Sequence, residues 1–326
     1  MRAATPLVDS VGRCIDYLRI SLTERCDLHC AYCHPGRRTT PPARDILTAD
    51  DIVNIARAAL GVGFCRFRLT GGEPLLREDL EAIVARLTAL PGLADLSLTT
   101  NGQQLAGRAQ SLADAGLMRV NISLDSLDAE AYSAITGGGN VGAVRRGLEA
   151  ALVAGLSPVK INVVLSSEAV LERDDIAAFA ELVQRRPVHV RFIEAMPTCD
   201  HVGYLPASVV LDRLRRLHNL LPIPGPNGAG PAHYYRLGDS SGSVGVITPI
   251  SSPFCSRCNR LRITARGELK PCLFSAASIH LLPALREADP VPHIAALITE
   301  AVAAKPPRYG DVAGASVIRA MHVIGG

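Results

Sequence analysis

The sequence predicts an α/β protein, an incomplete (βα)6 barrel of the TIM type with a smaller C-terminal domain. Short apolar segments alternate with helical patterns along the first two thirds of the chain, which is typical of parallel βα units. Most of these segments also alternate polar with apolar side chains. The length of 326 residues suits a barrel-sized domain plus a smaller one.

The predicted elements follow each other as strand and helix. We expect strands at 17–22, 65–70, 95–100, 119–125, 159–165 and 189–193. Thr48 can cap a helix that ends at Gly61, and apolar residues recur with the helical period from 80 to 87. Further helices are expected at 141–154, 174–184 and 207–218.

Polar side chains on four of the predicted strands should point into the barrel. The outer face of a barrel strand packs on helices and must be apolar, so the polar face lies inside. We therefore expect a wet, basic cavity. The alternative, which the long helical connections disfavour, is an antiparallel sheet with one solvated face. The polar residues are Arg19, Ser21, Arg66, Arg68, Thr70, Asn121, Ser123, Asp125, Lys160 and Asn162.

The composition changes after residue 220, where Pro and Gly crowd the segment 222–231 and predict a linker. We therefore predict two domains, 1–220 and 221–326.

The net charge of +3 is too small for bulk nucleic-acid binding, and no apolar run reaches transmembrane length. The first 13 residues lack the apolar core of an export signal, so we expect a cytoplasmic protein with no membrane partner. Nine cysteines in a reducing compartment suggest metal ligands.

Three cysteines, Cys26, Cys30 and Cys33, directly follow the first predicted strand with the spacing C-x3-C-x2-C. Three thiolates leave one iron of a 4Fe–4S cluster open to an outside ligand, which suits chemistry better than electron transfer alone. The alternative is zinc, with His29 or His34 as the fourth ligand, although this spacing is uncommon for zinc.

A second triad, Cys255, Cys258 and Cys272, lies in the C-terminal region with the spacing C-x2-C-x13-C. By itself this pattern could be half of a zinc ribbon. Arg260 and Arg262 follow it closely, so an anionic ligand could meet an open iron at this place.

The first triad, with Tyr32 before its last cysteine, resembles the signature of the radical S-adenosylmethionine (SAM) superfamily. Gly71-Gly72-Glu73-Pro74 resembles the superfamily motif that binds the SAM amino group. From Tyr17 to the terminal Gly325-Gly326, the chain resembles the GTP 3′,8-cyclase family of molybdenum cofactor biosynthesis. The segments with this resemblance are 68–74, 98–102, 121–125, 191–194, 254–262 and 324–326.

The resemblance implies SAM, two 4Fe–4S clusters and GTP as substrate. Cleaved SAM would give a deoxyadenosyl radical that removes hydrogen from C3′, and the product would be (8S)-3′,8-cyclo-7,8-dihydroguanosine 5′-triphosphate, made by a lyase. The implied GTP contacts are Arg19, Arg68, Thr99, Lys160, Arg260 and Arg262, with Arg66 and Arg191 as weaker candidates. The implied SAM contacts are Tyr32, Gly72, Ser123 and Met196. The tail Gly325-Gly326 is implied to reach the active site.

The implied partners are an electron donor such as flavodoxin or ferredoxin and, downstream, a cyclic pyranopterin monophosphate synthase. A homodimer is considered, although no sequence feature specifies it. Two other functions stay open: another radical SAM enzyme with an auxiliary cluster, and a non-catalytic iron–sulfur electron carrier. We assign no role to Cys14, Cys65 and Cys199, and His34 stands where the family often has methionine.

Overall fold

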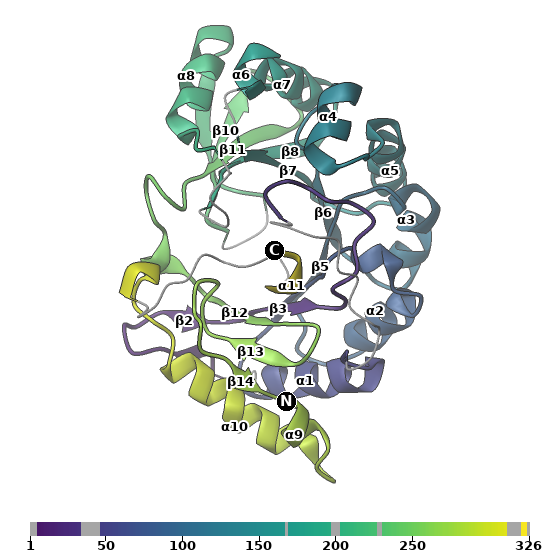
Figure 1. Ribbon diagram of the computed structural model, residues 1–326, viewed down its shortest axis with the longest axis vertical. Helices are drawn as coiled ribbons and strands as arrows, with labels where there is room; N and C mark the ends of the chain where they lie inside the picture. Colours follow the sequence, from purple (N-terminus) through teal and green to yellow (C-terminus); the bar gives the residue numbers. More distant parts are fainter. Residues whose placement is uncertain are drawn as a thin grey trace.

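A curved sheet of 12 strands dominates the computed structural model, with helices covering its outer face (Figure 1). The structure describes residues 5–33, 46–166, 169–196, 203–226, 230–311 and 321–324. His34, Cys199, Gly325 and Gly326 lie outside these ranges.

All six predicted strands are present, and they pair in parallel in sequence order, so the antiparallel alternative is wrong. They are β3 Tyr17–Ser21, β4 Arg66–Thr70, β5 Asp95–Thr100, β6 Arg119–Ser123, β7 Val159–Leu165 and β8 Val188–Glu194. The helices around them are α1 Ala49–Gly61, α2 Leu80–Thr88, α3 Leu105–Asp114, α4 Ala129–Thr136, α5 Val141–Val153, α6 Ala169–Glu172, α7 Asp175–Arg185 and α8 Ala207–Leu217.

Helix α1 begins as the sequence predicts. The Thr48 hydroxyl accepts a hydrogen bond from the amide of Asp51 (3.1 Å), and the Asp51 carboxylate accepts one from the amide of Thr48 (2.9 Å). This capping box satisfies two amides that the first helical turn leaves without partners. Helix α3 was not predicted, because only Leu105, Ala109 and Leu112 mark its buried face.

The chain beyond residue 220 extends the same sheet at both edges. Strand β12 pairs in parallel with β3, and β11 pairs in parallel with β8, which gives an open barrel of eight parallel strands. The domain boundary that we predicted at residue 220 stays a prediction. The remaining elements are β1 Leu7–Val8, β2 Cys14–Ile15, β9 Leu220–Ile223, β10 His233–Leu237, β11 Ser243–Ile247, β12 Arg260–Ile263, β13 Glu268–Lys270, β14 Ile279–His280, α9 Leu282–Leu285, α10 Pro290–Ala303 and α11 Met321–Ile324, with 3-10 turns at Pro74–Leu76, Cys255–Arg257 and Tyr309–Asp311.

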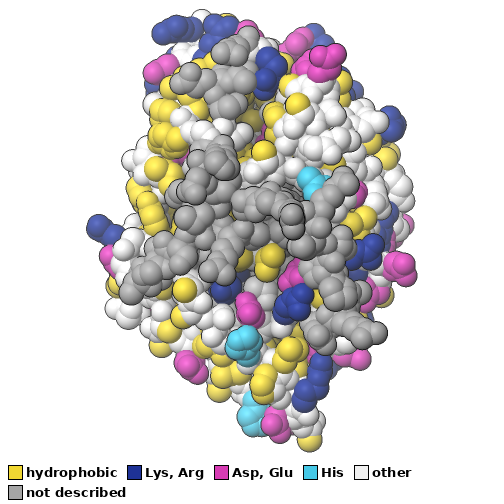
Figure 2. Space-filling model, in the orientation of Figure 1, with side chains coloured by type: hydrophobic (Ala, Val, Ile, Leu, Met, Phe, Trp, Pro, Cys, Tyr) yellow, Lys and Arg dark blue, Asp and Glu magenta, His cyan; other side chains and the backbone are white. Residues whose placement is uncertain are grey.

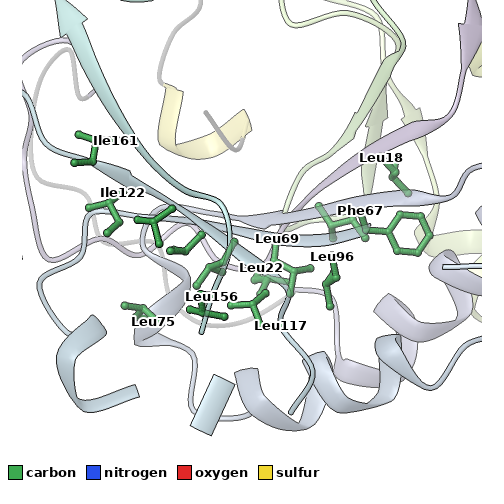
Figure 3. Close-up of a cluster of buried hydrophobic side chains, with 14 of the residues drawn as sticks. Leu18, Leu22, Phe67, Leu69, Leu75, Leu96, Leu117, Ile122, Leu156 and Ile161 are labelled. Carbon is green, nitrogen blue, oxygen red and sulfur yellow. The ribbon is translucent and has the colours of Figure 1, made fainter. Parts of the chain in front are cut away.

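The apolar side chains of the strands form the core between sheet and helices. Figure 3 shows part of this core, where Leu69, Leu96 and Leu117 lie between strands and the surrounding helices. Along the strands, apolar positions such as Leu69 and Leu96 alternate with polar ones, so the polar side chains point to the inside of the barrel.

The outer surface carries mixed charge. Figure 2 shows Lys and Arg side chains scattered among Asp and Glu over the visible face. Among the described residues, no helix has both the length and the apolar character needed to cross a bilayer.

A candidate active site inside the open barrel

One cavity of about 660 Å³ occupies the inside of the barrel. This volume lies within the range of pockets that hold small ligands. The cavity lining includes both cysteine triads and every predicted SAM and GTP residue, all of which lie within the described ranges. The basic cavity that strand alternation predicts is therefore confirmed, with Arg19, Arg68 and Lys160 among its walls.

The first triad lies in the loop after β3 and fits an iron–sulfur cluster. The Sγ atom of Cys26 accepts hydrogen bonds from the amide of Leu28 (3.4 Å) and the Asn101 side chain (3.9 Å). Burial raises the pKa of Cys26 to about 12 and that of Cys30 well above its usual value. Thiols buried in this way ionise when a metal replaces their protons, and the two donors to Cys26 suit a thiolate.

The Gly-Gly-Glu-Pro turn after β4 packs directly against the chain that precedes Cys26. The amide of Gly72 donates to the carbonyl of Thr23 (2.6 Å), and the amide of Glu73 donates to that of Arg25 (2.7 Å). A Cβ atom on Gly72 would lie 2.2 Å from the Arg25 carbonyl oxygen, so only glycine fits there. The turn therefore fixes the position of the first triad.

Tyr32 is held by a carboxylate at the end of β6. Its hydroxyl donates to Oδ2 of Asp125 (2.7 Å), whose Oδ1 accepts from the amide of Val164 (2.8 Å). Burial raises the pKa of Asp125 to about 6. This pairing joins the triad loop to β6 and β7, next to Ser123 in the cavity wall.

The second triad begins in the 3-10 turn Cys255–Arg257 and ends at Cys272, shortly after β13. Burial acts to raise the pKa of Cys258, but the nearby Lys305 and Arg260 outweigh it and lower that pKa. These two cations therefore favour the thiolate form of Cys258 more than burial alone would. Arg260 also stacks on the ring of Phe254, 5.4 Å from its centroid, which orients the guanidinium beside the triad.

In the described part of the chain, neither triad forms a ready ligand set for a single metal ion. In the described ranges, no three side chains of His, Cys, Asp or Glu converge closely enough to hold one metal ion. A zinc site needs four converging ligands, whereas a 4Fe–4S cluster binds its cysteines at different irons.

Three arginines occupy the same level on adjacent strands of the cavity wall. Arg19 on β3 pairs in register with Arg262 on β12 and with Arg68 on β4. Burial lowers the pKa of Arg68 and Arg262 to about 10, and neighbouring Arg260 adds to the effect on Arg262. Like charges so close together cost free energy, so this arginine row favours an anionic ligand.

Lys160 and Arg191 extend the basic wall, with neutral partners. The Lys160 ammonium donates to the Pro226 carbonyl (2.8 Å), and burial, aided by Arg191, lowers its pKa to about 6. Arg191 donates to the side-chain oxygens of Asn121 and Asn162. Arg66 differs, because it forms an ion pair with Asp16 (2.8 Å). Among the described residues, several buried polar atoms in the cavity wall have no hydrogen-bond partner, and these include the Nε atoms of Arg191 and Arg260 and the hydroxyl of Thr99.

Three residues at this site were not predicted from the sequence. Lys305 lines the cavity beside the second triad, and Arg13 binds the backbone of Cys255. The amide of Met321 in α11 donates to the Cys33 carbonyl (3.2 Å). None of these residues lies in a periodic pattern or a spaced motif. The one sequence signal was the isolated Lys305 directly before two prolines, which alone does not indicate a site.

Two family models match the chain. The model of the Radical SAM superfamily matches residues 20–180, and the model of Molybdenum Cofactor Synthesis C matches residues 188–311. Together they cover both cysteine triads and the barrel strands from the end of β3 onward.

Curated relatives match over nearly the whole length. The GTP 3′,8-cyclase of Pelotomaculum thermopropionicum is 47% identical over 98% of this chain and 99% of its own. That of Moorella thermoacetica is 46% identical over 98% and 99%, and that of Geobacter sulfurreducens is 42% identical over 93% and 94%.

Solved structures share the fold at low identity. Streptococcus suis SuiB bound to the precursor peptide SuiA superposes with a TM-score of 0.63 and 15% identity, over 91% of this chain and 66% of that one. Native anSMEcpe with bound AdoMet gives a TM-score of 0.57 and 17% identity, over 78% and 74%. Given the sequence matches, the chain belongs to the GTP 3′,8-cyclase family of the radical SAM superfamily.

Proposed function

We propose that this chain converts GTP to (8S)-3′,8-cyclo-7,8-dihydroguanosine 5′-triphosphate, as a cytoplasmic lyase in the first step of molybdenum cofactor biosynthesis. One observation supports this most strongly: a single cavity contains two cysteine triads and the arginine row. An electron carrier has no need of such a basic cavity, and a triphosphate requires several positioned cations.

In this proposal Cys26, Cys30 and Cys33 hold the 4Fe–4S cluster that binds SAM, and the second triad holds another 4Fe–4S cluster. When bound, the first cluster supplies the electron that cleaves SAM and so produces the radical that abstracts hydrogen. The chain itself keeps SAM in place. The residues that we assign to SAM are Tyr32, Gly72, Ser123 and Met196.

The substrate contacts follow from charge and position. The arginine row, Arg19, Arg68 and Arg262, would bind the triphosphate. The remaining contacts that we assign to GTP are Thr99, Lys160 and Arg260, with Arg66 and Arg191 as weaker candidates. Fixed cations on rigid strands hold the ribose in one orientation, which limits the radical to one C–H bond.

We also propose that the tail Gly325-Gly326 takes part in turnover. Helix α11, which ends at Ile324, lies near the centre of the ring of strands (Figure 1), and Met321 lines the cavity. Deleting Gly325-Gly326 should abolish most cyclisation while iron content and SAM affinity stay at the wild-type level. Full cyclase activity of the truncated protein would contradict this role.

The function is tested by anaerobic reconstitution of the clusters, followed by addition of SAM, GTP and dithionite. We expect deoxyadenosine together with an isomer of GTP. SAM cleavage without a changed nucleotide would favour another radical SAM enzyme, and no cleavage despite two reducible clusters would favour an electron carrier.

Replacing dithionite with flavodoxin or ferredoxin, and adding a cyclic pyranopterin monophosphate synthase, tests the proposed partners. Sedimentation of the same sample tests for a homodimer.

A further inference from the structure

Two buried cations far apart in sequence bind the backbone around the second triad. Arg13, next to β2 near the N-terminus, and Lys305, which follows α10, are 6% and 3% exposed. Neither was assigned to SAM or GTP. We call them the cation pair.

Arg13 binds backbone carbonyls of two separate segments. Its guanidinium donates to the carbonyl of Cys255 (2.8 Å) and to those of Pro306 (2.8 Å) and Pro307 (3.1 Å). Asp9 forms an ion pair with the same guanidinium and balances its charge. Arg13 therefore ties the first cysteine of the triad to the segment that follows Lys305.

Lys305 binds carbonyls next to the other two cysteines. Its ammonium donates to the carbonyl of Arg260 (2.8 Å), two residues after Cys258, and to that of Pro271 (2.7 Å), one residue before Cys272. Both acceptors are neutral carbonyls, so neither of them balances the charge of Lys305.

Together the two side chains hold the backbone at each cysteine of a triad whose members are up to 17 residues apart in sequence (Cys255 to Cys272). A buried cation that donates to carbonyls fixes their positions more firmly than a neutral donor would. Groups that contact the metal ligands, and not the metal itself, typically tune both the metal affinity and the reduction potential of the site.

We propose that Arg13 and Lys305 are positioning residues for the second cluster, and that Lys305 also raises its reduction potential. This inference rests on the proposed function, since it requires a cluster at the second triad. The charge of Lys305 stabilises the more negative, reduced form of a cluster. The charge of Arg13 is balanced by Asp9, so Arg13 acts through geometry.

The test uses the full chain with Cys26→Ala, Cys30→Ala and Cys33→Ala, so that only the second triad holds iron. Lys305→Met and Arg13→Met are added to this background one at a time. We expect each to weaken iron retention against a chelator by about tenfold or more. We expect Lys305→Met to shift the midpoint potential, followed by electron paramagnetic resonance, to a clearly more negative value than Arg13→Met does.

Arg108→Met is the matched control. Arg108 also pairs with a carboxylate, Glu81, and donates to two backbone carbonyls, those of Leu75 (2.6 Å) and Arg77 (3.0 Å). Arg108 lies on α3, and none of these three contacts involves the second triad. Iron retention and the midpoint potential of Arg108→Met should therefore equal those of the background protein.

The outcomes separate the inference from the proposed function. If the background protein binds no cluster, the second triad is not a cluster site, and the proposed function is contradicted. A background cluster that both variants retain as well as Arg108→Met, with an unchanged potential, would overturn the inference alone. Loss of the circular dichroism of the folded state in both variants would also overturn it, because the pair would then serve the fold as a whole.

Discussion

Lys160 carries a charge that depends on what lies beside it in the cavity. Burial and the neighbouring Arg191 lower its pKa to about 6, so most of the amine is neutral at pH 7.5 in the free protein. A bound triphosphate supplies negative charge, which raises this pKa again. Binding should therefore take up a proton, and affinity should fall as pH rises above 6.

Lys160→Met is expected to remove this proton uptake. Calorimetry of GTP binding at pH 7.5 in buffers of different ionisation enthalpy should give about one proton per GTP for the wild type. It should give much less for Lys160→Met and for the control Lys160→Arg, whose charge is permanent. Titration of GTP itself is common to all three proteins. Equal uptake by wild type and Lys160→Met would contradict the prediction.

Arg68 and Arg119 line the same cavity but should differ in their effect on stability. Burial and the nearby charges of Arg191, Arg119 and Arg260 lower the pKa of Arg68. Its guanidinium stacks on the ring of Tyr17, 5.4 Å from the centroid, and donates to the neutral hydroxyl of Ser97. Arg119 forms an ion pair with Asp95. Arg68→Met should therefore leave the thermal midpoint of the free protein unchanged or raise it, while GTP affinity falls about tenfold or more, the loss of a charged hydrogen bond.

Arg119→Met should instead destabilise the free protein by about 3 kcal/mol, because Asp95 loses its partner in a largely buried place. Thermal unfolding with and without GTP measures both effects. Destabilisation of the free protein by Arg68→Met to the same extent would show that the arginine row is not under electrostatic strain.

The sequence reveals only those site residues whose position follows a period or a spacing. Alternation along a strand indicates that Arg19, Arg68 and Lys160 face inward, because successive side chains point to opposite faces. Arg13 and Lys305 bind backbone carbonyls up to 294 positions away in sequence. Every residue has a backbone carbonyl, so the sequence does not indicate which carbonyl a distant cation will bind.

At the scale of elements, the turn after β4 and the triad loop after β3 depend on each other. A Cβ atom at Gly72 would clash with the backbone of Arg25, one residue before Cys26. We expect Gly72→Ala to cost about 1–3 kcal/mol of overpacking at this contact and to lower SAM affinity about tenfold or more. Iron at the second triad should be unaffected.

Gly107→Ala is the control for this substitution. Gly107 lies in α3, and nothing is within 4 Å of a Cβ atom built there, so alanine should stabilise the helix by about 0.5–1 kcal/mol. Equilibrium binding of SAM and iron content per triad compare the two variants. Wild-type SAM affinity in Gly72→Ala would show that the turn can move away from Arg25.

The predicted strands share a feature that β11 and β12 lack. Each of the six inner strands precedes a helix, and the sequence shows the helical pattern for all of them except β5, whose helix α3 was not predicted. A repeated βα unit therefore indicates these strands. Strand β11 follows an antiparallel strand, and β12 follows a cysteine-containing turn, so nothing local indicates that they join β8 and β3. These pairings join strands that are far apart in sequence, and the closure of such long loops cannot be recognised from a short stretch of sequence.

At the scale of the whole molecule, the sheet runs without a break across the predicted boundary at residue 220. Both β11 and β12 are hydrogen-bonded to strands of the first part, and the buried core includes Leu261 and Val244 together with Leu18 and Val190. Elements that share a sheet and a core unfold together, because neither part has a complete set of contacts alone.

We therefore expect the full chain to unfold in a single calorimetric transition, with equal calorimetric and van't Hoff enthalpies. A fragment that ends at residue 220 would leave β3 and β8 as exposed edges and uncover their apolar faces, so it should aggregate or unfold without cooperativity. The full chain with Lys160→Met, whose sheet stays complete, is the control for sample handling. Two resolved transitions, or a soluble fragment that melts cooperatively, would show that residues 1–220 form an independent domain, with the C-terminal strands docked on a barrel that is already stable.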